Sequence, residues 1–288
     1  MNLLMCCTPL GREDRYREEL RFVLLASIFF KSIYPQSKIF VGTTKNADIP
    51  KSLSKIIQFI RFPFEKLPFA MARIKFYEEF TKSNFFMNDT FFVGSDVLFL
   101  KKPDHNISDH SHLAMTYRYH LTMPYCSDLI FVKKQHQQIS TDFFRNVYKK
   151  MQWMPAQIQD GYAEQLSIAI EMGFLDINKF DGKTHNAPNN SNYLLLPGND
   201  FLYTPNDFFS SIKSDMAGQL INDIPDIESL EDLANTKHVI HFKGDRKKLF
   251  IIFSYLCKKN NMIKFNSNDY GYDESFLFKE FFDQYKGR

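Results

Sequence analysis

Short apolar runs alternate with longer amphipathic segments through the first half of the sequence, and this alternation constrains the fold more than any other feature. The runs at residues 3–7, 38–41 and 56–62 predict buried strands, whereas residues 16–33 and 69–80 repeat their apolar side chains at the spacing of a helix. Strands that alternate with helices form a mainly parallel sheet covered by helices on both faces. The sequence therefore predicts an α/β fold with a central, mainly parallel mixed sheet flanked by helices.

The second half of the chain continues this pattern less regularly. Further strands are predicted at residues 112–117, 129–133, 193–196, 201–203 and 238–242. Further helices are predicted at residues 140–151, 162–172 and 246–260. Residues 181–192 are rich in Asn, Pro and Gly and predict a surface loop. We expect a single domain at residues 1–260 and a C-terminal helical extension at residues 261–288 that packs on it.

The composition argues against several classes of protein. Aromatic residues make up 16% of the chain, which is typical of a large packed core and not of a disordered protein. A formal net charge of +3 is small for a nucleic-acid-binding protein, so we expect no nucleic-acid partner. The cysteines form no C-x-x-C pair, and no apolar run approaches the length of a membrane span. These features predict reduced thiols and a cytoplasmic protein, with contact at the inner face of the membrane left open.

An aspartate interrupts one of the most apolar runs of the chain. Residues 90–100 read Thr-Phe-Phe-Val-Gly-Ser-Asp-Val-Leu-Phe-Leu, so Asp96 stands among residues of a buried strand. A buried carboxylate without a partner is costly, and ligands of open α/β sheets bind at the carboxyl ends of strands. We therefore expect a break or bulge that turns the carboxylate of Asp96 into a ligand site. A structural Asp that caps a turn is the alternative.

A second polar cluster lies near the end of the chain. Residues 241–247 read His-Phe-Lys-Gly-Asp-Arg-Lys. Imidazole combined with carboxylate oxygens suits a cation such as Mn²⁺, and a lysine can neutralise a phosphate. Gly244 allows a close approach of the backbone. The segment therefore indicates an anion or metal site, and a core or surface histidine followed by a glycine turn is the alternative.

These two segments resemble motifs of the GT-A glycosyltransferases, and within them the glycogenin and bacterial lipooligosaccharide galactosyltransferase family. That family carries a D-x-D motif at the end of a strand and a late H-x-x-G-x-x-K motif. The late motif is complete here in His241, Gly244 and Lys247, without the Pro-Trp extension that usually follows it. The first motif is represented by Gly-Ser-Asp at residues 94–96, so its last Asp is present and its first is replaced by Gly.

The resemblance implies that Asp96 and His241 hold a divalent cation, Mn²⁺ or Mg²⁺, that bridges the two phosphates of a nucleotide-sugar donor. Because residue 94 is Gly, one contact of the family pattern to the metal or the ribose is absent. The residues implied to contact the donor are Thr8, Ser95, Gly244 and Lys247.

Two further segments resemble the family more loosely. Residues 125–132 resemble its small polar segment before a strand, where the donor or acceptor sugar is contacted, and residues 163–166 resemble its acidic-Gln pair at the start of a helix. In the family the acidic residue contacts hydroxyls of the donor sugar and the Gln lies near the anomeric carbon. The resemblance therefore implies catalytic roles for Asp128, Glu164 and Gln165. A charge at a strand edge and an ordinary solvated helix face are the alternatives.

The implied activity is transfer of a hexose from a nucleotide-diphosphate sugar to a carbohydrate or lipid-linked acceptor, with UDP as the expected nucleotide and retention of the anomeric configuration. The C-terminal extension could contribute to the acceptor side. Other functions stay open: a metal-independent or inverting enzyme of the same fold, or a catalytically weak or inactive nucleotide-sugar-binding protein. A peripheral membrane module built on residues 249–257, between two lysine pairs, is also open, although a buried core helix is the favoured role. The sequence leaves the oligomeric state open.

Overall fold

The computed structural model of the chain describes residues 1–9, 13–104, 107, 110–118, 124–159, 162–176, 178, 181–204, 233–242, 247–259, 261–263 and 278. Its strands are β1 (Asn2–Cys6), β2 (Lys38–Thr44), β3 (Ile57–Phe62), β4 (Thr90–Val93), β5 (Val97–Phe99), β6 (Leu113–Tyr117), β7 (Tyr125–Val132), β8 (His185–Ala187), β9 (Asn190–Pro197) and β10 (Val239–His241). Its longer helices are α1 (Glu13–Ile33), α2 (Phe69–Lys82), α3 (Gln137–Gln152), α5 (Ala163–Met172) and α8 (Lys247–Lys259). Two short helices are α4 (Ala156–Gln159) and α6 (Gly198–Phe201).

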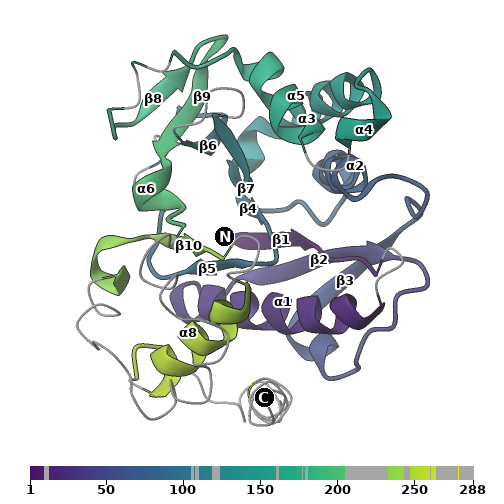
Figure 1. Cartoon of the computed structure of the whole chain (residues 1–288), viewed down its shortest axis with the longest axis vertical. Coiled ribbons are helices and arrows are strands. Elements are labelled where there is room, and N and C mark those ends of the chain that lie inside the picture. Colours follow the sequence, from purple (N-terminus) through teal and green to yellow (C-terminus); the bar gives the residue numbers. More distant parts are fainter. Residues whose placement is uncertain are drawn as a thin grey trace.

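A large sheet runs through the described part of the chain in the strand order β3-β2-β1-β4-β7-β6-β9-β8 (Figure 1). β1 pairs in parallel with β2 and β4, and β2 pairs in parallel with β3. α1 connects β1 to β2, because parallel neighbours need a crossover connection. α2 leads from β3 at the edge of the sheet back to β4 on the other side of β1. β7 is antiparallel to both β4 and β6, so the sheet is mixed beyond β4. The predicted mixed sheet flanked by helices is confirmed.

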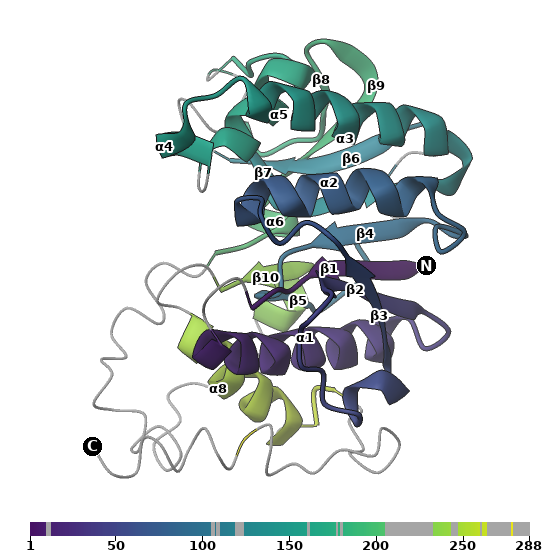
Figure 2. The ribbon, with the colours of Figure 1, turned by 90° about the vertical axis from the view of Figure 1, so that its right-hand side faces the viewer.

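Alternation of side chains along the strands divides the core into two layers. In β1, Leu3 and Met5 pack in the layer with α1 and α8, whereas Leu4 and Cys6 pack in the layer with α2, α3 and α5. Figure 2 shows these two sets of helices on opposite faces of the sheet. Strands that are buried on both faces need apolar residues at every position, which explains the continuous apolar runs in the sequence.

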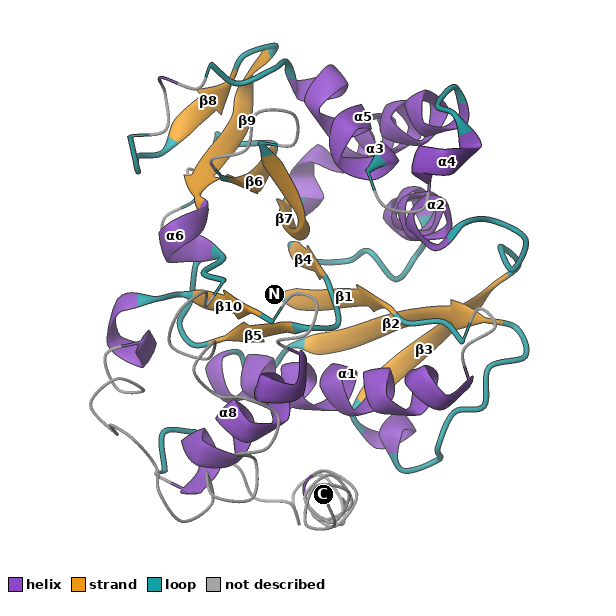
Figure 3. Ribbon diagram, in the orientation of Figure 1, coloured by secondary structure: helices purple, strands orange, loops and turns teal. Residues whose placement is uncertain are grey.

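The run at residues 90–100 divides into β4 and β5, which belong to different sheets (Figure 3). β4 lies in the large sheet, whereas β5 pairs antiparallel with β10 in a two-stranded sheet. The break falls at residues 94–96, as expected from the carboxylate inside this run. Because His241 is opposite Val97 in the pairing of β5 with β10, the break brings the end of β10 beside Asp96.

Two predictions for the second half of the chain are wrong. Residues 181–192, expected to form a loop, contain β8 and the start of β9, which pair as an antiparallel hairpin. The Pro and Asn residues reflect the tight turn at residues 188–189. Residues 201–203 were expected to form a strand. Instead, Phe201 ends the short helix α6, and of these three residues only Tyr203 makes a strand-like bridge, to Ile240. An apolar run this short does not distinguish a strand from a helical turn.

The predicted helix near the end of the chain is present as α8, and its apolar face lies in the core. The Phe250 ring lies 5.2 Å from the Phe22 ring of α1. The buried residues of α8 include Phe250, Ile251, Phe253 and Cys257. This packing favours the core-helix role for residues 249–257 over the membrane-module alternative. No helix in the described residues combines the length and the apolar character that a membrane span requires.

Most of the C-terminal extension at residues 261–288 lies outside the described residues. Within the described part, Phe278 is buried and its ring lies 5.6 Å from the Tyr255 ring of α8. The division of the chain at residue 260 therefore stays a prediction.

A buried carboxylate ties α2 to α3. Glu78 of α2 is 2% exposed, and it accepts hydrogen bonds from Lys75 at 2.7 Å, Lys82 at 2.6 Å and Arg145 of α3 at 3.2 Å. Burial alone would raise the pKa of Glu78, but the hydrogen bonds from the lysines outweigh it and hold the pKa at about 2. The ionised carboxylate therefore stabilises the folded state.

We predict that Glu78→Gln lowers the free energy of unfolding at pH 7 by about 1–3 kcal/mol, because it removes the buried charge that the three cations share. The effect stays in this range because the partner cations are partly exposed and solvent screens them. A depressed pKa contributes stability that is complete above the unfolded pKa of 4.5 and is lost as the pH falls towards 2. Urea unfolding of both proteins between pH 7 and pH 2.5 measures this difference.

The matched control is Glu79→Gln. Glu79 pairs with Lys75 and Lys82 at 3.2 and 3.1 Å, but its side chain is 45% exposed. Its loss should therefore cost less than about 0.5 kcal/mol. Equal effects of the two substitutions, or a Glu78→Gln effect that does not change with pH, would contradict the assignment of the buried ion network.

Candidate active site

The two predicted metal ligands come from distant parts of the sequence and meet at one point. Asp96 follows the break after β4, and His241 ends β10. The backbone N–H of Phe242 donates a hydrogen bond of 2.9 Å to the carbonyl of Asp96, which locks the two segments together. The distance from Oδ1 of Asp96 to Nε2 of His241 is 3.5 Å, and both side chains are buried. The expected convergence of these two side chains is thus present.

Asp128 of β7 joins the same cluster. β7 pairs antiparallel with β4 so that Leu129 is opposite Val93, and the backbone N–H of Gly94 donates to the carbonyl of Asp128 at 3.3 Å. Oδ2 of Asp128 lies 3.6 Å from Nε2 of His241. The imidazole therefore lies within reach of two carboxylates.

The two carboxylates control the charge of the histidine. Burial alone would lower the pKa of His241, but Asp128 and Asp96 outweigh it and hold the pKa well above 6.5. The ring therefore favours the protonated form while no cation is bound. A divalent cation that binds Nε2 would take the place of this proton, because only a neutral imidazole is a ligand.

Arg73 of α2 connects Asp128 to the next element of the site. Its Nη1 donates to Oδ1 of Asp128 at 3.0 Å, and its Nη2 donates to the hydroxyl of Ser127 at 3.1 Å and to Oε2 of Glu164. Sequence reasoning missed this residue. The available signal was its spacing, because Arg73 lies three residues after Ala70 and four before Tyr77, on the buried face of α2.

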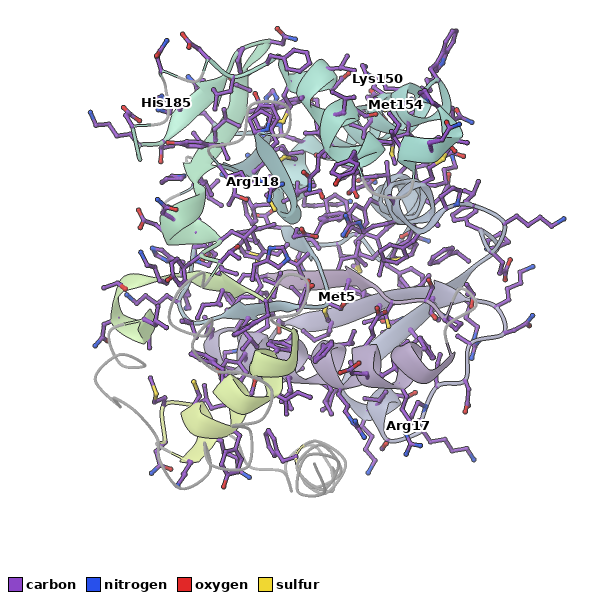
Figure 4. All side chains as sticks on the ribbon, in the orientation of Figure 1. Met5, Arg17, Arg118, Lys150, Met154 and His185 are labelled. Atoms are coloured by element: carbon purple, nitrogen blue, oxygen red, sulfur yellow. The ribbon has the colours of Figure 1, made fainter. Side chains whose placement is uncertain are left out.

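The acidic-Gln pair at the start of α5 is buried. Glu164 and Gln165 both belong to the buried residues of this helix, so the solvated-face alternative is wrong. Burial raises the pKa of Glu164, and Arg73 opposes that rise. Oε1 of Gln165 accepts a hydrogen bond of 2.7 Å from Nη2 of Arg118, which directly follows β6 (Figure 4). Arg118 is a second residue that sequence reasoning did not single out.

The residues expected to contact the donor are only partly described. Thr8 follows β1, and its buried hydroxyl oxygen has no hydrogen-bond partner among the described residues. Ser95 is buried within the break after β4. β1 and β4 are parallel, so these two segments leave the sheet at the same edge. Gly244 and the side chain of Lys247 lie outside the described residues, and their roles stay predictions.

The cluster suits a divalent cation. Carboxylate oxygens and imidazole are both good ligands for Mn²⁺, whereas Mg²⁺ prefers the carboxylate oxygens. Neighbouring ligands of such an ion lie about 3 Å apart, so the separations of 3.5 and 3.6 Å around Nε2 of His241 need only a small inward shift. Cys126, expected to be only a reduced thiol, also lies here, with its Sγ 3.5 Å from Oδ2 of Asp128.

The sequence matches no protein-family model and no curated protein. Among solved structures, the chain is similar to the apo form of the glycosyltransferase GlyE of Streptococcus pneumoniae TIGR4, with a TM-score of 0.52 and 11% identity over 98% of this chain and 63% of that one. The chain has a GT-A glycosyltransferase fold. At this identity the similarity establishes the fold alone. This chain spans less than two thirds of the length of GlyE.

Two other similar structures are glycosyltransferases as well. One is the galactosyltransferase LgtC in complex with donor and acceptor sugar analogues, at 11% identity, with 89% of this chain and 96% of that chain covered and a TM-score of 0.47. The other is a glycosyltransferase involved in the glycosylation of the major capsid of PBCV-1, at 8% identity, with 88% and 98% covered and a TM-score of 0.48.

We predict that Arg73→Met lowers the free energy of unfolding by about 3–5 kcal/mol, because it leaves the buried Glu164 and the partly buried Asp128 as neighbouring carboxylates without their shared cation. Adding Glu164→Gln removes one of those charges and should recover at least about 1 kcal/mol. Urea unfolding of the two single variants and the double variant forms a thermodynamic cycle. Strictly additive effects would show that the guanidinium does not pair with Glu164 in the folded protein.

Proposed function

We propose that this protein is a glycosyltransferase that moves a hexose from a nucleotide-diphosphate sugar, with UDP as the nucleotide, to a carbohydrate or lipid-linked acceptor. The observation that carries the proposal is the 3.5 Å approach of the Asp96 carboxylate to the His241 imidazole, at the end of strands in a GT-A fold. Ligands of open α/β sheets bind at this edge. A carboxylate and a histidine held together there form the start of a site for the cation of a metal–diphosphate complex.

In this proposal the diphosphate leaving group is stabilised from several sides. Asp96 and His241 hold a divalent cation, Mn²⁺ or Mg²⁺, which when bound supplies Lewis-acid stabilisation of the charge that develops on the phosphates. Lys247 adds a positive charge against the departing diphosphate. Thr8, Ser95 and Gly244 contact the nucleotide, and the buried hydroxyl of Thr8 supports this role because it has no partner among the described residues.

The sugar ring carries the opposite charge as the glycosidic bond breaks. Its oxocarbenium-like state is stabilised by nearby carboxylates, here Asp128 and Glu164, which Arg73 holds in one cluster. The amide of Gln165, oriented by Arg118 at 2.7 Å, is the group proposed to lie near the anomeric carbon and to position the acceptor hydroxyl. Retention of configuration is the outcome expected from the family resemblance.

We predict that nucleotide sugars raise the melting temperature of the protein in the presence of Mn²⁺, because ligand at about 100 times its Kd adds about 2.7 kcal/mol of stability. With the best donor, Asp96→Asn and His241→Ala should each lower the rate of transfer or donor hydrolysis by about 100-fold or more. Circular dichroism checks that the variants remain folded.

Asp142→Asn is the control, since the side chain of Asp142 is 45% exposed on α3 and contacts none of these residues. Its rate should equal that of the wild type. Wild-type rates in both Asp96→Asn and His241→Ala would contradict the proposal.

The glycine at residue 94 favours two alternatives, and the same assay separates them. Full activity in EDTA would identify a metal-independent GT-A enzyme. Donor binding with neither transfer nor hydrolysis in Mn²⁺ would identify a catalytically inactive nucleotide-sugar-binding protein. Loss of activity in EDTA with recovery on adding Mn²⁺ is the outcome that we expect.

A further inference from the structure

Residue 94 is crowded by two carboxylates. A Cβ atom built on Gly94 would lie 2.8 Å from Oδ1 of Asp96 and 3.0 Å from Oδ1 of Asp128. A Cβ contact below 3.0 Å is essentially never seen and one at 3.0 Å is unusually tight, so a side chain at residue 94 would require the Asp96 carboxylate to move and the Asp128 carboxylate to give slightly. Carboxylates from two other positions therefore occupy the space around the glycine.

One of those carboxylates comes from the neighbouring strand. β4 and β7 pair with Val93 opposite Leu129, which sets Asp128 beside Gly94 across the sheet. Residue 94 is also the position where the resembling glycosyltransferases carry the first Asp of their D-x-D motif. This chain thus lacks an acidic group at residue 94 and has one at residue 128, against the same point in space.

We infer that Asp128 is a direct ligand of the divalent cation and supplies the acidic group that residue 94 lacks. The inference rests on the proposed function and completes its metal site with the ligand set Asp96, Asp128 and His241. Asp128 is thereby given a metal-binding role in place of contact with the sugar alone.

The orientation of the Asp128 carboxylate fits this role. Its Oδ1 accepts the hydrogen bond from Nη1 of Arg73 at 3.0 Å, while its Oδ2 lies on the side of His241, 3.6 Å from Nε2. Asp96 approaches the same nitrogen at 3.5 Å. Among the described residues, Asp128, His241 and Cys126 form a group whose potential ligand atoms all lie within 4.8 Å of one another. Asp96 borders this group through Nε2 of His241, and its carboxylate would have to shift towards Asp128 to share an ion with it.

The charges around the cluster also call for a cation. Arg73 is shared between Asp128 and Glu164, so one positive charge serves two carboxylates. Asp96 adds a third carboxylate, with its Oδ1 3.5 Å from Nε2 of His241. Arg73 and a protonated His241 ring carry two positive charges against these three negative ones. A divalent ion that takes the place of the proton on Nε2 would balance the cluster.

Mn²⁺ binding to the purified full chain tests the inference without any assay of transfer. Electron paramagnetic resonance counts free Mn²⁺ during titration, with Mn²⁺ alone and with Mn²⁺ plus UDP. We expect Asp128→Asn to weaken Mn²⁺ binding at least about ten-fold, comparable to Asp96→Asn. The control is Asp142→Asn, because the Asp142 side chain is 45% exposed on α3 and pairs with Arg145. Its Mn²⁺ affinity should stay within about three-fold of the wild type.

A double variant that moves the acidic residue from position 128 to position 94 distinguishes loss of metal binding from a folding defect. Asp128→Gly removes one of the two carboxylates beside residue 94, and Gly94→Asp then returns an acidic group from the other strand, with the Asp96 side chain shifting to admit it. The double variant should bind Mn²⁺ at least about ten-fold more tightly than Asp128→Gly alone.

Three outcomes would overturn the inference: equal Mn²⁺ affinity of Asp128→Asn and Asp142→Asn, no gain in the double variant, or no Mn²⁺ binding by the wild type in either condition. Failure of the proposed function is distinguishable from these outcomes. Mn²⁺ bound through Asp128 by a protein that transfers no sugar would contradict the function and leave the ligand assignment intact.

Discussion

The antiparallel pairing of β5 with β10 is the interaction on which the candidate site depends. β4 belongs to the large sheet, and the chain leaves that sheet at residues 94–96 to form a second ladder with a strand from near its end. Next to this ladder, the backbone N–H of Phe242 donates a hydrogen bond of 2.9 Å to the carbonyl of Asp96. Without it, nothing in the described residues would bring His241 to Asp96. The proposed metal ligands Asp96 and His241 are therefore positioned by backbone hydrogen bonds of strands that are themselves buried.

A second constraint acts from the opposite side of the cluster. Arg73 reaches from α2 to Asp128 on β7 and to Glu164 at the start of α5. A buried guanidinium with two carboxylate partners holds three elements in one arrangement, because each group would be costly to leave unpaired. Main-chain pairing thus fixes Asp96 and His241, while a side-chain ion network fixes Asp128 and Glu164.

Much of the fold could be predicted from the sequence because its strands are buried on both faces. Continuous apolar runs identified β1, β2, β3 and β4, and helical spacing identified α1, α2, α3, α5 and α8. The polar interruption at Asp96 predicted the break after β4, since a buried carboxylate has to be turned towards a partner. The hairpin of β8 and β9 was missed because its turn-forming residues outnumber its apolar ones, and short runs such as residues 201–203 carry too little periodicity.

The site itself was predictable only where a local pattern carried it. His241 and Asp96 belong to recognisable motifs. The spacing of Arg73 on α2 places it on the buried face but does not reveal its partners, and Arg118 acts through a contact between elements that the sequence does not show. The burial of Glu164 depends on how α5 packs, and an amphipathic pattern in a helix of this length does not settle that. The relation between residues 94 and 128 depends on the register of β4 against β7, which is a property of the folded sheet.

That register has a consequence for how sequences of this kind can diverge. A side chain at residue 94 would crowd the carboxylates of Asp96 and Asp128, so an acid at residue 94 and an acid at residue 128 disfavour each other. An exchange of one acid for the other is therefore expected to pass through a chain that carries neither, or to change both codons together. Searches that require an acid at residue 94 would overlook any descendant in which that exchange is complete.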